Sequence, residues 1–168
     1  MHLDLTAAVM LHCNAERRLY VSAGGPLTVP EAEKWLRDVV ENDNTKAFAI
    51  VHLATDRTVG FIVFEDLRAS RHNATVTIGL TELAGVGVGM EACLLGGQYI
   101  FHREGVHRVT APVIAGNLLS ERLMMRLGFR VEGRVREAAW VAGQYRDLMM
   151  YGLLRREATW LPSRYEGV

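Results

Sequence analysis

The chain has 168 residues, of which 49% are apolar and 23% charged, and its 19 Lys plus Arg balance its 19 Asp plus Glu. It lacks the basic excess of a nucleic-acid binder, any apolar run near the roughly 20 residues of a membrane span, and the pattern of a secretory signal. We therefore expect one domain over residues 1–168, cytoplasmic, with no nucleic acid and no membrane as partner.

The N-terminal part predicts a short strand and two helices. Residues 1–5 alternate weakly, as in an edge strand, and Thr6 is suited to cap a helix over 6–13. Thr28 with Glu31 forms a capping box, in which each residue satisfies a backbone N–H of the other. One apolar face at helical spacing follows, formed by Ala32, Trp35, Leu36, Val39 and Val40.

Three strands are expected next. Residues 46–53 and 59–64 are rich in apolar and β-branched side chains and flank a turn at 55–58, which predicts a hairpin. Residues 66–73 read as a polar loop, and residues 75–80 as a third strand.

The second half predicts a helix, a strand, a second helix and two long strands, at residues 88–104, 106–114, 117–128, 129–141 and 145–154. Gly105 is the expected C-cap of the first of these helices. Gly96 and Gly97 inside it each cost roughly 1 kcal/mol relative to alanine, so we expect them where the helix packs closely against the sheet. The order predicts one mixed α/β (α+β) unit with its strands mostly in hairpins.

A glycine loop precedes the helix at residue 88. Gly85, Gly87 and Gly89 leave backbone N–H groups unobstructed at a helix N-terminus, an arrangement that binds phosphate. A dinucleotide fingerprint would need a third glycine at Met90, and a Walker loop would need a Lys-Ser/Thr pair, so both of these sites are disfavoured. A glycine turn with a purely structural role is the alternative.

The stretch from residue 83 to 155 resembles the C-terminal two-thirds of a GNAT-superfamily acyl-CoA N-acetyltransferase, most closely its Rim-type branch. The family pattern Asn-x-x-Ala/Ser-x-x-Leu-Tyr-x-Lys-x-Gly-Phe is matched at Asn117, Ser120, Leu123, Arg126, Gly128 and Phe129. Glu132 to Glu137, with Tyr145 and Asp147, is typical of the Rim-type branch. The resemblance implies the GNAT acyl-CoA N-acyltransferase fold, a central, mostly antiparallel twisted sheet flanked by helices, with acetyl-CoA as co-substrate.

The resemblance also implies where the cofactor binds. The loop amides would hold the CoA pyrophosphate, and Asn117 would contact the pantetheine arm. The implied cofactor-binding residues are Leu80, Thr81, Gly85, Val86, Gly87, Val88, Gly89, Met90, Asn117 and Arg122. Two positions depart from the family pattern, since Ala84 replaces a basic or amide residue and Met124 replaces the tyrosine that protonates the departing thiolate in many relatives.

The predicted reaction is direct transfer of an acetyl group to an amine, with N–H groups at the splayed end of the third strand stabilising the oxyanion. Neither cysteine has a histidine partner, so no acyl-enzyme is expected. Ser120 lies one turn before Met124 and is the candidate acid. The amine needs a base, and the candidates are Glu82 and Glu137, with Glu65 and Asp66 as further carboxylates near the cleft.

Other polar residues are interpreted as structural. Asp147 is expected to form an ion pair with Arg136 or Arg134 across the last hairpin. His102 is expected at a helix end and His107 at a strand start, whereas His72 lies in a loop that can border the acceptor site. No His/Cys/Asp/Glu cluster has metal-ligand spacing, so no metal is expected.

The acceptor stays open between a protein N-terminal amine and a small-molecule amine. The alternative function is a non-catalytic module that binds acyl-CoA or a protein partner on the same fold, because Ala84, Met124 and a third strand without glutamate all depart from the pattern. The short first strand leaves a sheet edge that a second copy can cover, so a homodimer is expected.

Overall fold

The computed structural model describes residues 28–67, 73–81 and 86–163. Its elements in chain order are α3 (Val29–Glu41), β1 (Lys46–His52), β2 (Arg57–Glu65), β3 (Asn73–Leu80), α4 (Val88–His102), β4 (Arg108–Ile114), α5 (Leu118–Arg126), β5 (Arg130–Val141), β6 (Gln144–Leu154) and the 3-10 turn η1 (Arg155–Glu157). The strand expected at 1–5 and the helix expected at 6–13 lie outside these described residues.

The element types follow the sequence prediction, and some boundaries differ. β3 begins at Asn73, inside the predicted loop, because Asn73 already pairs with Arg108 of β4. The turn between β1 and β2 lies at 53–56, with Asp56 at a φ of 51°, so it precedes the predicted position by two residues. α4 ends at His102 rather than residue 104, and Gly105 follows its C-cap in the left-handed conformation, with a φ of 68°.

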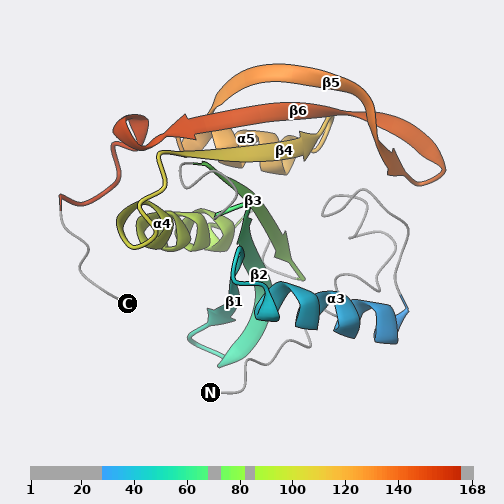
Figure 1. Ribbon diagram of the computed structural model, residues 1–168, viewed down its shortest axis with the longest axis horizontal. Coiled ribbons are helices and arrows are strands. Elements are labelled where there is room, and N and C mark those ends of the chain that lie inside the picture. The colour runs from blue at the N-terminus through green and yellow to red at the C-terminus, as the bar shows by residue number, and fades with distance from the viewer. Residues whose placement is uncertain (1–27, 68–72, 82–85, 164–168) are drawn as a thin grey trace.

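The strands form one mixed sheet in the order β1-β2-β3-β4-β6-β5 (Figure 1). Every neighbouring pair is antiparallel except β3 and β4, which are parallel. This agrees with the predicted mostly antiparallel sheet. The long β5–β6 hairpin ends the sheet on one side, and the β1–β2 hairpin ends it on the other (Figure 1).

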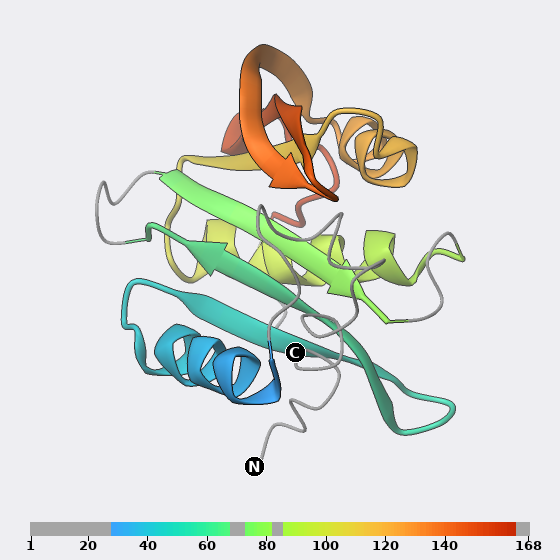
Figure 2. The same ribbon diagram turned by 90° about the vertical axis from the view of Figure 1, so that its right-hand side faces the viewer.

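The helices cover opposite faces of the sheet (Figure 2). Alternation along β2 decides which side chain goes where, because successive side chains of a strand point to opposite faces. Phe61 and Val63 pack against Leu36 and Val39 of α3. The main core lies on the other face, where Ile62 and Phe64 pack with side chains of α4 and α5.

Gly96 and Gly97 lie where α4 meets its neighbours most closely. A Cβ on Gly96 would come within 3.0 Å of the Phe64 ring on β2, which confirms the predicted contact with the sheet. A Cβ on Gly97 would come within 2.5 Å of the Trp160 ring, so this glycine packs against the segment after η1 instead. Trp160 is held in place, since its indole N–H donates to the Leu127 carbonyl at 2.9 Å.

We expect Gly97→Ala to lower the free energy of unfolding by about 1–3 kcal/mol, the usual cost of overpacking a core. The gain in helix propensity, roughly 1 kcal/mol, opposes this loss and does not cancel it, because Trp160 cannot move without breaking its hydrogen bond. Urea denaturation followed by tryptophan fluorescence measures the change. Gly133→Ala is the control, since a Cβ there has no atom within 4 Å. An unchanged midpoint in Gly97→Ala would contradict the packing.

Candidate active site

The two parallel strands of the sheet separate part way along their length. β3 and β4 are paired only at Asn73 with Arg108, Ala74 with Val109 and Thr75 with Thr110. Both strands continue, β3 to Leu80 and β4 to Ile114, without further pairing. The result is a wedge between two backbones that opens toward their carboxyl ends.

The backbone of β3 presents hydrogen-bond donors to this wedge. The Thr81 N–H donates to the Val59 carbonyl of β2 at 2.8 Å. In an antiparallel ladder the amides alternate in direction along the strand, so those of Leu80 and Ile78 point away from β2, toward the wedge. This is where the predicted oxyanion donors at the splayed end of the third strand would lie.

The N-terminus of α4 lies beside the end of β3. Gly87 is its N-cap at a φ of 100°, and a Cβ there would meet nothing within 4 Å. A glycine supplies no side-chain acceptor, so its side chain caps none of the first-turn N–H groups, which have no partner inside the helix. These donors and the positive end of the helix dipole fit a phosphate group. Gly85, Ala84 and Glu82 lie outside the described residues.

Gly89 brings three elements of the site together. A Cβ on this buried residue would lie 3.5 Å from Leu80 Cδ1 and 3.6 Å from Leu123 Cδ2. The end of β3, the start of α4 and the middle of α5 therefore meet at one point. Of the predicted cofactor-binding set, this packing assembles Leu80, Gly87, Val88 and Gly89, while Val86 is exposed before them.

Asn117 lies beyond the end of β4, on the other side of the wedge. It is 8% exposed and is the N-cap of α5, where its Oδ1 accepts from the Ser120 N–H at 3.2 Å. The predicted cap is therefore confirmed, and the predicted pantetheine contact stays a prediction. The Ser120 side chain is half-buried in the first turn of α5, and Arg122 is exposed two residues further along.

Glu137 lies apart from these residues, on the exposed part of β5. It has a φ of 52°, and its N–H donates to Asp147 Oδ1 at 2.7 Å. Asp147 also forms the predicted ion pair, with Arg134 as the partner. The Glu137 N–H, followed by Arg134, lowers the pKa of Asp147. The hairpin thus holds Glu137 by its backbone and leaves its carboxylate exposed.

The core side of α5 offers no acid or nucleophile. Met124, at the position of the family tyrosine, is 2% exposed and lines a small apolar cavity together with Cys93. Burial raises the pKa of the Cys93 thiol to about 12. A thiol that stays protonated is a poor nucleophile, in agreement with the prediction of direct transfer.

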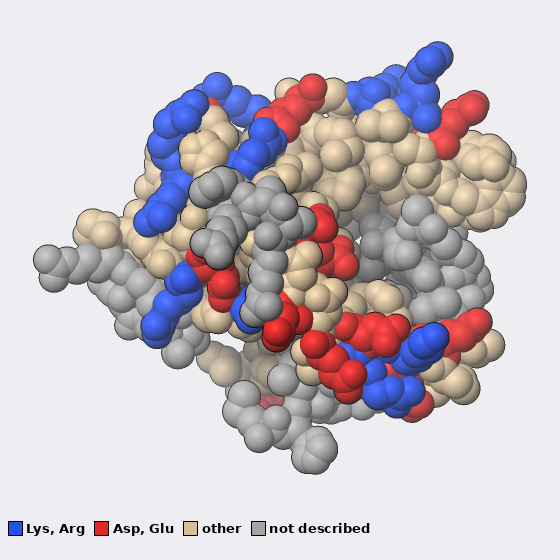
Figure 3. Space-filling model, in the orientation of Figure 1, with Lys and Arg blue, Asp and Glu red and all other residues tan. Residues whose placement is uncertain are grey.

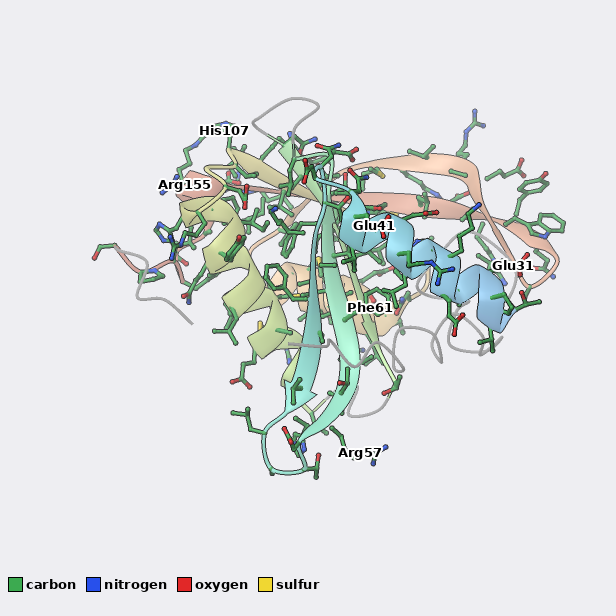
Figure 4. The ribbon with its side chains drawn as sticks, turned by 60° about the horizontal axis from the view of Figure 1, so that its bottom comes forward. Glu31, Glu41, Arg57, Phe61, His107 and Arg155 are labelled. Atoms are coloured by element: carbon green, nitrogen blue, oxygen red, sulfur yellow. The ribbon has the colours of Figure 1, made fainter. Side chains whose placement is uncertain are left out.

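The remaining histidine and metal predictions concern structural positions. His102 is the last residue of α4 and His107 directly precedes β4, as predicted, while His72 lies outside the described residues. Figure 4 shows His107 close to Arg155, whose N–H donates to the His107 carbonyl at 2.9 Å. In the described ranges no group of three or more His, Cys, Asp and Glu can hold a metal ion.

Sequence reasoning did not single out the sheet face on the α3 side of the wedge. Glu65 at the end of β2, Thr75 and Thr77 on β3, and Thr110 and Pro112 on β4 share this face by strand alternation and register. All five are half-buried. The signal was present in the sequence as the alternation of threonine with apolar residues along β3, which marks a polar face.

Comparison with known proteins identifies the family. The model of the acetyltransferase (GNAT) domain family matches residues 2–130. The probable N-acetyltransferase YjcK of Bacillus subtilis (strain 168) is 30% identical over 117 residues, which are 68% of this chain and 65% of that protein. The putative ribosomal N-acetyltransferase YdaF of the same organism is 36% identical over 76 residues, 45% of this chain and 42% of that protein.

A solved structure shares the fold over nearly the whole length. The spermidine N-acetyltransferase from Vibrio cholerae, in complex with CoA and spermine, superposes with a TM-score of 0.84 at 19% identity and covers 94% of each chain. The aligned parts span 65% and 42% of the two curated relatives.

The chain belongs to the acetyltransferase (GNAT) domain family. This confirms the predicted fold and the predicted acetyltransferase family. The ribosomal relative confirms the likeness to the Rim-type branch. Within the described residues, no helix has the length and hydropathy to cross a membrane.

Asn117→Ala is expected to lower the free energy of unfolding by about 1 kcal/mol, because the Ser120 N–H loses its acceptor. Asn117→Ser is the matched control, since serine caps helices about as well as asparagine, and it should retain most of the stability. Urea denaturation monitored by circular dichroism compares the two variants. Equal losses in both would mean that the cap contributes nothing.

Proposed function

We propose that this protein is an acetyl-CoA-dependent N-acetyltransferase that moves the acetyl group directly to a primary amine. The observation that carries the proposal is the wedge between β3 and β4, flanked by the N-terminus of α4 and by Asn117. For an extended ligand, the wedge has backbone N–H donors along one wall and phosphate-binding amides at its mouth. The family match and the CoA complex of a fold neighbour support the same reading.

The residues present fit such a co-substrate. The first-turn amides of Val88, Gly89 and Met90 are proposed to hold the pyrophosphate, with Arg122 adding a positive charge. Leu80, Thr81 and Asn117 are proposed to contact the pantetheine arm. The thioester supplies an electrophilic carbonyl, and the amides of β3 that face the wedge are proposed to stabilise the negative charge that develops on its oxygen.

Ser120 is proposed to protonate the departing thiolate, because its hydroxyl lies in the first turn of α5, one turn before Met124. Glu82, which lies outside the described residues, and Glu137, which lies apart from the wedge, remain candidate bases. The acceptor is proposed to be a peptide N-terminus or a small polyamine, because the named relatives include a ribosomal and a spermidine N-acetyltransferase. We further propose a single domain over 1–168, a cytoplasmic location and a homodimer.

Release of free CoA thiol with a panel of amines tests the activity. The panel contains a peptide with a free N-terminus, spermidine and an amino sugar, and mass spectrometry of the product identifies the added acetyl group. We expect amine-dependent thiol release with at least one of them. CoA binding by calorimetry without turnover on any amine would instead favour the non-catalytic binding module, and no CoA binding would contradict both functions.

Gly87→Asp is expected to weaken CoA binding relative to Gly87→Asn. Both side chains are strained equally at a φ of 100° and both can cap the helix, so they differ only in charge. A carboxylate beside the pyrophosphate should raise the Kd roughly three- to tenfold over the Asn variant, and added salt should shrink the difference. Calorimetric titration at low and high salt measures both effects. Equal Kd values would place the phosphates elsewhere.

A further inference from the structure

We propose that Glu65 is the general base of the transfer reaction, accepting the proton of the acceptor amine at the point where β3 and β4 part. The inference rests on the proposed acetyl transfer and assigns a residue to it. Glu65 is the one carboxylate on the described strands β2, β3 and β4, which border the wedge.

Strand alternation directs Glu65 to the acceptor side of the sheet. Phe61 and Val63, four and two residues earlier on β2, pack against α3. Glu65 continues this row, so its side chain points to the α3 face and away from the core under α4. α4 supplies the phosphate-binding amides from the opposite face, which leaves the α3 face for the amine.

The register of the sheet places Glu65 beside the opening of the wedge. Glu65 is paired with Thr75, and Thr75 with Thr110 is the last pair before the two parallel strands separate. Side chains directly opposite on neighbouring strands have Cβ atoms about 4.5–5.5 Å apart, and the diagonal neighbour, here Thr77, about 7–8 Å away. A glutamate side chain extends toward the neighbouring strand, so its carboxylate lies over Thr75, beside the narrow end of the wedge.

The described elements leave this part of the face accessible. α3 packs on β1 and β2 through Trp35, Leu36 and Val39, and the Trp35 and Phe61 rings are 5.7 Å apart. Thr75, Thr77 and the residues of β4 on the same face are only half-buried. Figure 4 shows Glu41 at the end of α3 that lies beside the sheet, and Glu31 at the end that projects away from it.

Among the described residues, no group holds the Glu65 carboxylate. Its neighbour Asp66 accepts from the Thr75 hydroxyl at 3.0 Å, whereas no hydrogen bond or ion pair within the described residues engages Glu65. Burial, and then the charge of Asp66, raise the pKa of Glu65. A carboxylate with a raised pKa holds a proton more firmly, which suits a base that works near neutral pH.

Other charged groups surround this end of the sheet. Lys46 begins β1 opposite Phe64, and Arg108 begins β4 opposite Asn73. Glu41 is the last residue of α3, and Asp43 lies in the loop after it. That loop is tied to the end of β2, since the Leu67 N–H donates to the Asn44 carbonyl at 3.1 Å. Acidic side chains outnumber Lys34 and Arg37 over α3 (Figure 3), so an ammonium ion that approaches from this side meets a net negative field.

The proton and electron balance is simple. Ionised Glu65 takes one proton from the ammonium form of the acceptor, and the freed lone pair attacks the thioester carbonyl. The C–N bond forms, and the C–S bond breaks as the nitrogen loses its second proton. Ser120 gives a proton to the departing CoA thiolate, and the second proton from the nitrogen replaces it through solvent. Glu65 then returns its own proton to solvent, so the products are the amide and the CoA thiol.

Glu65→Gln tests the assignment. We expect kcat/KM to fall about 100-fold or more, the usual contribution of a general base, with the Kd for CoA unchanged. The ratio of wild-type to variant kcat/KM, measured from pH 5.5 to 9, cancels the ionisation of the acceptor amine that both proteins share. This ratio should decrease as the pH drops through the pKa of Glu65, because protonated glutamate is no better a base than glutamine.

Two further variants define the result. Glu65→Asp keeps a carboxylate and should recover part of the activity and the pH dependence of the ratio. Glu104→Gln, an exposed residue after α4, should behave as wild type. A ratio of wild-type to Glu65→Gln kcat/KM near one at every pH would overturn the assignment. It would also be overturned if the ratio fell at low pH for Glu137→Gln and not for Glu65→Gln. A wild-type protein without turnover would contradict the proposed function itself, so the two failures are distinguishable.

Discussion

The separation of β3 from β4 after three paired residues is the constraint on which the site depends. Two parallel strands that stay paired leave no backbone group for a ligand, because every amide is used by the ladder. Here pairing stops at Thr75 and Thr110. Beyond these residues β3 stays in the sheet through its pairing with β2, and β4 through its pairing with β6. The antiparallel ladders on both flanks therefore hold the wedge open.

Packing at the wide end of the wedge fixes the position of α4. Gly89 fits between Leu80 and Leu123, so a side chain larger than that of alanine would push the helix N-terminus away from β3. Further along α4, Gly96 and Gly97 allow contact with Phe64 and Trp160. Glycines that weaken the isolated helix thus set its distance from the sheet, and the helix dipole is directed at the mouth of the wedge as a consequence.

Local signals in the sequence predicted most of the fold, and long-range ones were missing. The helix Val29–Glu41 was predicted from its capping box, which is observed, and the cap by Asn117 was predicted from one residue type at one position. The start of β3 at Asn73 and the wedge itself depend on long-range strand pairing. Asn73, for example, pairs with Arg108, 35 positions further along the chain. Strand register of this kind leaves no mark in a single sequence. For the same reason the shared face of Glu65, Thr75 and Thr110 became visible only with the register known.

The charge distribution around Glu65 has two opposing effects on catalysis. Acidic residues along α3, and the negative end of that helix at Glu41, raise the local concentration of a cationic amine. The same negative potential stabilises the ammonium form of the amine and so makes its proton harder to remove. A base whose own pKa is raised by burial and by Asp66 compensates for this, because the proton moves between two groups that feel the same field. The position of a carboxylate relative to the wedge and to α3 therefore matters more for this reaction than its place in the sequence motif.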